Sequence, residues 1–554
     1  MTSLSDLRAA TAGGDSLPRW GMIADLRRCV GCQTCTAACK HTNATPPGVQ
    51  WRRVLDVETG DFPHVTRTFV PIGCQHCEDP PCMHVCPSTA TGQRADGIVT
   101  IDYDICIGCA YCAVACPYQA RYKIDKPLFA YGRNRRMNNE AQREMPERIG
   151  VAQKCTFCSD RVDAGLEKGL TPGVDPEATP ACVNSCIATA LSFGDLNDAN
   201  SNVSVLLREN KSFRMHQEVG THPGFHYIWE AGHDEGTAQE MLDTGYEPSE
   251  ARDEPLRPIV GGVEPWLQRH WDWRAAMNFI CGGTGAGLMI AGGFLGTMGG
   301  VPQTLVTLAA VGFVCLGLFM VFLETGRPLR APINVFFHAA TSWMTREAMV
   351  GALLVPLGLL CFLTGWGWLS LPAALLAAGY LYCQGRILEQ AKGIPAWREK
   401  RIVPLIAATG LTEGLGLFTA AGALFFPGDA VLAGAIVMVL AAVARAVAWS
   451  AYLRALRRGA PTLTLRVLNG HAYVLLIGGL IVPLALVTIG VMVPAFTAWV
   501  LLAGGLAAAA AGWILKFVIV TKASYNQGFA LVRTPERGTG TGGGAGVGIK
   551  PGWS

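Results

Sequence analysis

The sequence predicts two parts of different architecture: an α+β domain of small cysteine-rich modules, followed by an all-α bundle of membrane helices. Two observations support this division. Sixteen of the 20 cysteines lie between Cys29 and Cys186, and long apolar runs dominate the sequence after about residue 270. Half of the 554 residues are hydrophobic, which is unusual for a soluble protein. A chain of this length is also expected to form more than one domain.

The sixteen cysteines form four groups of four. They are Cys29, Cys32, Cys35 and Cys39; Cys74, Cys77, Cys82 and Cys86; Cys106, Cys109, Cys112 and Cys116; and Cys155, Cys158, Cys182 and Cys186. The first and third groups have the spacing C-x2-C-x2-C-x3-C. In bacterial ferredoxins, three such close cysteines hold one cluster and the fourth reaches the neighbouring cluster. Four complete groups therefore predict four [4Fe–4S] clusters.

Disulfides and zinc sites are the two other roles that closely spaced cysteines could have. Disulfide scaffolds are small and secreted, whereas this segment is long and its cysteines are closely spaced. Zinc sites also use C-x2-C pairs. However, three cysteines at i, i+3 and i+6 with a fourth at i+10, present twice, are far more typical of iron–sulfur clusters. Residues 1–200 are accordingly predicted to form an α+β ferredoxin-like four-cluster domain, with short strands such as 97–101 between the motifs.

Residues 201–270 contain no cysteine and are predicted to be an extension and a linker, with a solvated acidic stretch over 233–254. The net charge of +3 gives no argument for binding to nucleic acid. Residues 1–20 are polar, and Arg27-Arg28 is followed at once by Cys29 rather than by an apolar stretch. We therefore expect neither a secretory signal nor a twin-arginine export signal.

Residues 271–525 are predicted to form an eight-helix transmembrane bundle, because a membrane helix needs about 20 mainly apolar residues. Abundant glycine and alanine favour close helix packing. A flexible tail, 526–554, is expected to follow. The eight predicted spans are 275–298, 303–325, 347–366, 368–386, 402–426, 430–453, 467–492 and 496–521.

The order of the cysteine motifs and their two inserted loops resemble the electron-transfer subunit of the dimethyl sulfoxide reductase and polysulfide reductase family of molybdenum enzymes. This resemblance covers about residues 18–200. The segments TGRPLR (325–330), TSWMTRE (341–347) and YNQGFAL (525–531) resemble the membrane-anchor subunit of the same family. The two subunits are separate chains in most relatives and are expected to be fused here.

The resemblance implies that the first motif pairs with the fourth and the second with the third. Spacing alone shows only that four clusters are possible. The implied ligand sets are Cys29, Cys32, Cys35 and Cys186; Cys155, Cys158, Cys182 and Cys39; Cys74, Cys77, Cys82 and Cys116; and Cys106, Cys109, Cys112 and Cys86.

Haem is not expected, because only His338 and His471 follow His270 in the sequence and a b-type haem usually takes two histidines from the spans. The anchor therefore resembles the haem-free type, which exchanges electrons with quinone directly. Quinone reduction needs a proton carrier near the ring. Glu347, at the start of the third span, is the best candidate, although a helix-start carboxylate that interacts with the helix dipole is almost as plausible.

Arg346 and His338 flank Glu347 and are expected to hydrogen-bond the quinone oxygens, with Asn278 on the same side. Glu413 and Arg445 lie deeper in their spans. Ionisable residues within spans are functional candidates, but a buried ion pair between these two is at least as plausible.

The predicted function is that of a fused electron-transfer and anchor subunit. The resemblance implies a separate molybdenum or tungsten bis-pterin catalytic subunit, with the membrane quinone pool and the lipid bilayer as further partners. Sulfite dehydrogenase and phenylacetyl-CoA oxidoreductase types are the preferred comparisons, with oxidation of sulfite slightly ahead. The alternatives are a quinol-oxidising reductase, a pure anchor that passes electrons to a cytochrome, and an ion pump that uses Glu413, Arg445 and Lys516.

Lys and Arg residues occur in every loop on one predicted side of the membrane and in none on the other. Cytoplasmic loops are the ones enriched in these residues. With eight spans both ends of the bundle lie on one side, so the cluster domain is expected on the cytoplasmic face of a bacterial inner membrane. Docking of basic loops to an acidic partner would be a competing cause of the bias.

Overall fold

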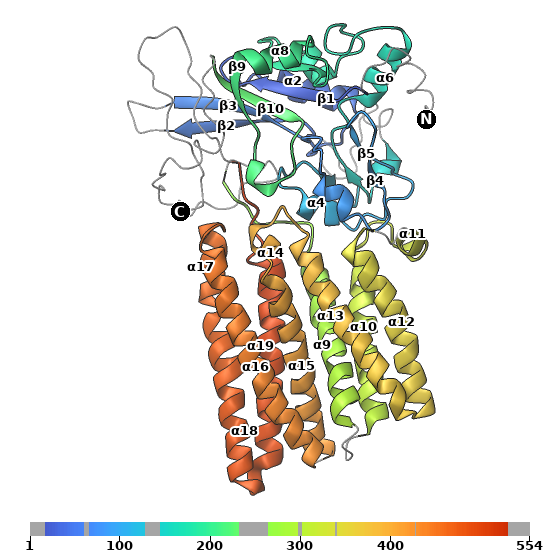
Figure 1. Cartoon of the computed structure of the whole chain (residues 1–554), viewed down its shortest axis with the longest axis vertical. Coiled ribbons are helices and arrows are strands. Elements are labelled where there is room, and N and C mark those ends of the chain that lie inside the picture. The colour runs from blue at the N-terminus through green and yellow to red at the C-terminus, as the bar shows by residue number, and fades with distance from the viewer. Residues whose placement is uncertain are drawn as a thin grey trace.

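The computed structural model has the two parts that the sequence predicts, a mixed α/β domain at one end and a long helical bundle at the other (Figure 1). The fold class is therefore confirmed. The structure describes residues 17–59, 66–127, 145–231, 264–296, 302–337, 341–426 and 428–529.

The first domain is organised around a four-stranded sheet of order β8-β1-β10-β9. The strands are β1 (Trp20–Asp25), β8 (Leu191–Asp195), β9 (Asn210–Phe213) and β10 (Phe225–Ala231). β1 pairs in parallel with β10 and antiparallel with β8, and all six of its residues are buried, as expected for a central strand. The sheet therefore includes strands that follow residue 200 in the sequence.

Three two-stranded hairpins lie between the cysteine motifs. They pair β2 (Arg53–Thr59) with β3 (Thr66–Ile72), β4 (Thr91–Gln93) with β5 (Val99–Ile101), and β6 (Tyr122–Lys123) with β7 (Ala152–Gln153). The expected strand at 97–101 is β5. The remaining elements of the domain are the helices α2 (Thr34–Thr42), α3 (Pro81–His84), α4 (Tyr111–Ala115), α6 (Ser159–Glu167), α7 (Ala181–Asn184) and α8 (Asn202–Glu209), with short 3-10 turns at Pro146–Arg148 and Gln217–Val219.

Four of these short helices carry cysteines of the motifs. Cys39 is inside α2, and Cys82, Cys112 and Cys182 are inside α3, α4 and α7. The last cysteines of the second and third motifs follow α3 and α4 and precede a proline. Proline disfavours the helical conformation in the residue before it, so these helices end there.

Antiparallel helices form the bundle. They are α9 (Trp273–Leu295), α10 (Gln303–Glu324), α12 (Trp343–Thr364), α13 (Ser370–Glu389), α15 (Ile402–Phe425), α16 (Asp429–Leu456), α17 (Thr462–Gly470) continued by a π-helix (Val474–Ile481) and α18 (Val482–Met492), and α19 (Thr497–Thr521). Short helices α11 (Ala331–Phe337) and α14 (Pro395–Arg398) and 3-10 turns at Pro328–Arg330, Gly367–Leu369 and Pro494–Phe496 connect them.

Within the described residues, seven helical segments are long and apolar enough to cross a membrane. The predicted span 368–386 corresponds to α13, which is a helix of 20 residues in the bundle but is not among these seven. Its last turns carry Gln384, Arg386 and Glu389, which lower its hydropathy. The other seven predicted spans each match one of the segments.

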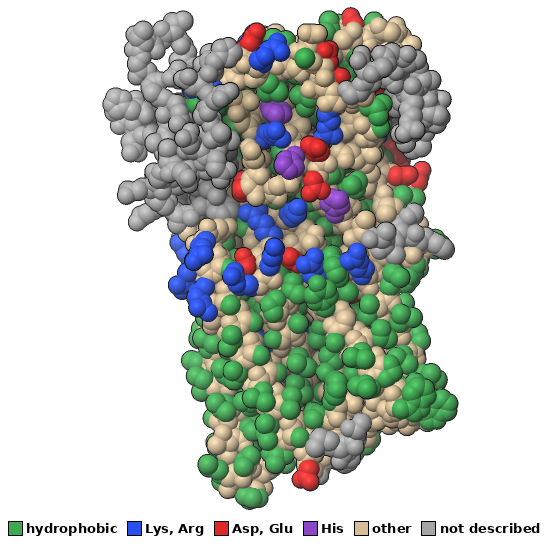
Figure 2. All heavy atoms as spheres, viewed as in Figure 1, with side chains coloured by type: hydrophobic (Ala, Val, Ile, Leu, Met, Phe, Trp, Pro, Cys, Tyr) green, Lys and Arg blue, Asp and Glu red, His purple; other side chains and the backbone are tan. Residues whose placement is uncertain are grey.

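Apolar side chains predominate on the face of the bundle seen in Figure 2, and Lys and Arg side chains form a belt where this face meets the first domain. Exposed residues of the bundle include Phe319, Leu353, Leu440 and Val447. Such an exposed apolar surface is far larger than a soluble domain carries. The chain is therefore a membrane protein.

Glycine lets the central helices touch. A Cβ atom added at Gly414 of α15 would overlap the backbone of Gly287 of α9, and one added at Gly505 of α19 would overlap the carbonyl oxygen of Gly416. These contacts bring α9, α15 and α19 backbone to backbone along the middle of the bundle, as small residues do in membrane helices.

Candidate functional site

Two cavities in the first domain are lined by thiols from different motifs. One has an empty volume of about 330 Å³ and the other of about 320 Å³. The thiols around the first belong to Cys29, Cys32, Cys35 and Cys186, and those around the second to Cys74, Cys77, Cys82 and Cys116.

Electrostatic contacts identify two further groups of thiols. Burial raises the pKa of the Cys39 thiol, and the neighbouring thiols of Cys155, Cys182 and Cys158 raise it further. Burial likewise raises the pKa of Cys109, as do Cys112, Cys86 and Cys106. The structure thus brings together the same four sets of four cysteines that the family resemblance implies.

Buried cations lie among these thiols. The Arg121 guanidinium donates a hydrogen bond to Cys82 Sγ at 2.9 Å and is 3% exposed. Burial alone would lower the pKa of Arg121, but the neighbouring thiols, Cys82 first, raise it above its usual range. Arg52 is buried in the same way near Cys182 and Cys155. A buried cation needs a compensating negative charge, so these residues fit thiolates that remain charged.

The thiols do not converge on a point. Among the residues that the structure describes, no group of three or more Cys, His, Asp or Glu side chains is arranged to hold a single metal ion. The thiols of two of the sets instead surround open voids, an arrangement that suits a cluster larger than one ion.

The loop that carries Cys106 and Cys109 rests on the bundle. The backbone N–H of Gly326 donates to the carbonyl of Gly108 at 3.2 Å, and Trp271 Nε1 donates to the carbonyl of Cys109 at 3.1 Å. Gly108 has φ +70°, and a Cβ atom at Gly326 would overlap the backbone of Gly150. Glycine is therefore required on both sides of this contact.

The three sequence segments that resemble a membrane anchor all contact the cysteine motifs. Gly326 belongs to the first. In the second, Ser342 Oγ donates to the carbonyl of Val85 at 2.7 Å and Thr345 Oγ1 to that of Pro87 at 3.1 Å. In the third, Gln527 Nε2 donates to the carbonyl of Pro117 at 3.4 Å. These segments hold the cluster domain against the bundle.

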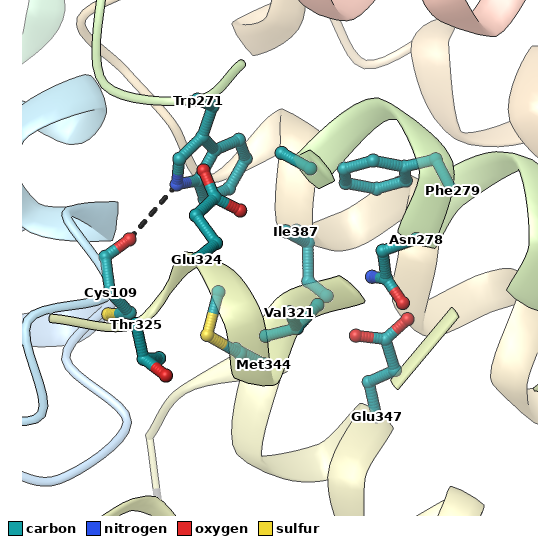
Figure 3. Close-up of a pocket in the computed structure, with 11 residues that line it drawn as sticks. Cys109, Trp271, Asn278, Phe279, Val321, Glu324, Thr325, Met344, Glu347 and Ile387 are labelled. Carbon is teal, nitrogen blue, oxygen red and sulfur yellow. Dashed lines mark hydrogen bonds between the residues drawn. The ribbon is translucent and has the colours of Figure 1, made fainter. Parts of the chain in front are cut away.

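A pocket with an empty volume of about 350 Å³ lies at this junction (Figure 3). It includes Cys109, so one wall comes from a cysteine motif and the others from helices. On α9, α10 and α12 the lining residues are three or four positions apart and share a helix face. The lining consists of Cys109, Trp271, Ala275, Asn278, Phe279, Val321, Glu324, Thr325, Met344, Glu347 and Ile387.

Glu347 and Asn278, both predicted site residues, face one another in this pocket (Figure 3). Glu347 is 3% exposed and Asn278 is 4% exposed. One carboxyl oxygen of Glu347 and the amide oxygen of Asn278 have no hydrogen-bond partner among the described residues. Tyr380 and Gln384 also surround the Glu347 carboxyl. The pocket thus holds polar atoms that a ligand can satisfy.

Another predicted site residue lies elsewhere. Arg346 is not in the pocket lining, and its guanidinium lies 4.3 Å from the centre of the Trp343 ring. Consecutive helical residues point about 100° apart, so Arg346 and Glu347 do not share a face. His338 lies outside the described residues.

Glu413 forms a separate buried site deeper in the bundle. Lys516 Nζ lies 2.7 Å from its carboxylate, and Thr284 Oγ1 donates to the same oxygen at 3.0 Å. The expected pair between Glu413 and Arg445 is therefore wrong. Arg445 instead donates to the backbone carbonyls of Gly479 and Ala508.

Pro483 explains why the Gly479 carbonyl can accept from Arg445. It lies four residues after Gly479 and has no backbone N–H to donate to that carbonyl, which accepts from Arg445 at 2.7 Å. The helix is a π-helix over Val474–Ile481, just before this proline.

Glu324 and Trp271 are among the pocket residues that sequence analysis did not single out. Glu324 is the last residue of α10, directly before the TGRPLR segment, and its acidic side chain at the end of a span was a usable signal. Trp271 precedes α9 and had no such signal.

Comparison with known proteins supports an iron–sulfur role. Residues 65–129 match the 4Fe-4S dicluster domain family. The chain is 39% identical to the B subunit of selenate reductase from Mesobacillus selenatarsenatis, over 40% of this chain and 76% of that protein. It is 36% identical to the B subunit of sulfite dehydrogenase from Allochromatium vinosum, over 37% of this chain and 81% of that protein. It is also 36% identical to the Hdr-like menaquinol oxidoreductase iron–sulfur subunit 1 of Archaeoglobus fulgidus, over 38% of this chain and 82% of that protein.

The buried Glu413–Lys516 pair gives a test of stability. Lys516→Met leaves a buried carboxyl without its cation, so the free energy of unfolding is expected to fall by about 3–5 kcal/mol. Replacing both residues, Glu413→Gln with Lys516→Met, is expected to recover most of this loss. Thermal unfolding of the purified chain in detergent measures both effects, with the exposed Lys400→Met as control. A double variant as unstable as the single one would contradict the pairing.

Proposed function

Because this chain belongs to the family of iron–sulfur B subunits of molybdenum oxidoreductases, we propose that it transfers electrons between a separate catalytic subunit and membrane quinone. Its cysteine-rich domain would hold four [4Fe–4S] clusters, which transfer electrons one at a time when bound. Its helical domain would anchor the complex in the membrane and bind the quinone.

The observation that carries this proposal is the pocket at the junction. Cys109, a member of one of the four thiol sets, lines the same pocket as the carboxyl of Glu347. A quinone bound there would contact a cluster ligand and a proton carrier at once. The wall between them is mostly apolar, as the flat ring of a quinone requires. The name of one relative, a menaquinol oxidoreductase subunit, agrees with this chemistry.

The residues of this chain have distinct roles in the proposal. Trp271 and Phe279 bound the ring and exclude water, while the side-chain amide N–H of Asn278 donates to one quinone oxygen. Glu347 gives a proton to that oxygen or takes one from it. Arg52 and Arg121 compensate the negative charge of the thiolates.

The catalytic partner would be a molybdenum or tungsten bis-pterin subunit. Sulfite oxidation with reduction of quinone remains the preferred direction, in line with the sulfite dehydrogenase relative. The reverse direction, oxidation of quinol by a reductase, is the second candidate because a relative of higher identity comes from a selenate reductase. Reduction of the clusters by added quinol or by substrate would distinguish the two directions.

Iron content tests the four clusters and their ligand sets. The purified chain is expected to contain about sixteen iron atoms and little zinc, because each cubane cluster contains four irons. Cys29→Ala and Cys186→Ala, alone or together, are expected to leave about twelve irons, since both residues belong to one set. Cys29→Ala with Cys74→Ala should leave about eight. A loss of two clusters from the pair Cys29 and Cys186 would contradict the pairing.

Glu347→Gln tests the quinone site. The variant is expected to keep its full iron content but to form quinol about 100-fold more slowly, because general acid–base catalysis is worth a factor of this order. The measurement is stopped-flow reduction of decylubiquinone by the prereduced chain in nanodiscs. Glu389→Gln is the matched control, since Glu389 is a buried carboxyl that pairs with Arg386 outside the pocket. Unchanged turnover in Glu347→Gln would place the proton carrier elsewhere.

The orientation of the chain in the membrane can be inferred from the belt of Lys and Arg side chains. All Lys- and Arg-containing loops lie at the end of the bundle that carries the cluster domain, and we propose that this end is cytoplasmic. Green fluorescent protein fused after Ser554 is expected to fluoresce. Alkaline phosphatase is expected to be active when inserted after Gly365, in an opposite loop, and inactive after Ser554. The reverse pattern of phosphatase activity would overturn the assignment.

A further inference from the structure

The pocket at the junction contains two carboxyl groups, at opposite ends. Figure 3 shows Glu324 beside Trp271 and Glu347 facing Asn278, with Val321, Met344 and Ile387 in the space between. Both carboxyl side chains are buried, at 7% and 3% exposure, and each has one oxygen without a hydrogen-bond partner among the described residues. A quinone also has two oxygens at opposite ends of its ring, and each gains a proton on reduction.

Helix stability does not explain the position of Glu324. It is the last residue of α10, and the negative end of a helix dipole disfavours a carboxylate there. Glu347 lies in the second turn of α12, beyond the first turn in which a helix dipole acts. The two carboxyls therefore have different electrostatic surroundings although they share one pocket.

Glu324 lies beside charged side chains that reach solvent at the level of the cluster domain. Lys123 Nζ donates to the carbonyl oxygen of Glu324 at 3.1 Å and lies 3.1 Å from Asp125, whose side chain is 61% exposed. Asp272 and Arg274 also act on the Glu324 carboxyl, and the Asp272 side chain is 41% exposed. Glu324 is thus next to surface groups that exchange protons with solvent.

His270 is not expected to be the proton carrier at this end of the pocket. Its pKa is lowered to about 4 by burial and then by Lys123, so the ring is neutral at pH 7. Around Glu347 the neighbours are the uncharged side chains of Asn278, Tyr380 and Gln384. Each end of the pocket therefore offers one carboxyl as its proton carrier.

We propose that the quinone reaction uses both carboxyls, with Glu324 serving the oxygen beside Trp271 and Glu347 serving the oxygen beside Asn278. This inference rests on the proposed quinone site. The cluster that the Cys109 set would hold would supply the two electrons of the reduction, one at a time. Each carboxyl O–H bond breaks and one quinone C=O becomes C–OH at each end. Each carboxylate then recovers a proton from water. Oxidation of quinol reverses every step.

The experiment uses the full chain in nanodiscs with its clusters reduced by dithionite and the excess reductant removed. Decylubiquinone is added, and formation of quinol and reoxidation of the clusters are followed together from pH 5.5 to 9. The variants are Glu324→Gln, Glu324→Asp, Glu347→Gln and the control Glu389→Gln. Binding of decylubiquinone to each oxidised variant is measured separately.

Glu324→Gln is expected to bind decylubiquinone as the wild type does, to form quinol at least about tenfold more slowly, and to lose one ionisation from the pH profile. Glu324→Asp, which keeps a carboxyl, should recover part of the rate, and so should acetate added to Glu324→Gln. Neither recovery is expected from a residue that only supports the fold.

Three outcomes would overturn the inference. A wild-type rate and pH profile in Glu324→Gln would mean that Glu347 alone serves both oxygens. A slower rate explained entirely by weaker binding would make Glu324 a binding residue only. If the wild type does not reduce decylubiquinone although its clusters are reduced, the proposed quinone site itself fails, and this inference with it.

Discussion

The loop between Cys106 and Cys109 meets the bundle through direct contact of two backbones, at Gly108 and Gly326. A side chain at Gly326 would push the domains apart, and with them the wall of the pocket that Cys109 supplies. The position of Trp271 depends on the same contact, because its indole N–H donates to the Cys109 carbonyl. The pocket wall at this part of the junction therefore depends on one close approach that only glycine permits.

Local spacing made much of this structure predictable. The four cysteine groups, the strand at 97–101 and the apolar spans all depend on residues close together in the sequence. Glu347 and Asn278 were also found, because an acidic or amide side chain inside an apolar run is conspicuous. The assembly of thiols from distant motifs was not derivable from spacing, since it depends on how the domain folds back on itself.

The failures have a common physical cause, which is that partners distant in sequence are chosen by packing. Glu413 pairs with Lys516, 103 residues away, rather than with Arg445, whose partners are backbone carbonyls. Arg346 lies on a different face of its helix from Glu347, and its guanidinium packs on the Trp343 ring. The parallel pairing of β1 with β10 joins residues about 200 positions apart, and no sequence pattern predicts this pairing.

Cluster domain and bundle belong to one polypeptide, and this changes how the complex is assembled. When two such parts are separate chains, their contact depends on the concentration of each and is lost on dilution. A covalent link replaces that dependence with a fixed effective concentration. The cell thus makes the two parts in a strict ratio of one to one, and every bundle enters the membrane attached to its own cysteine-rich domain.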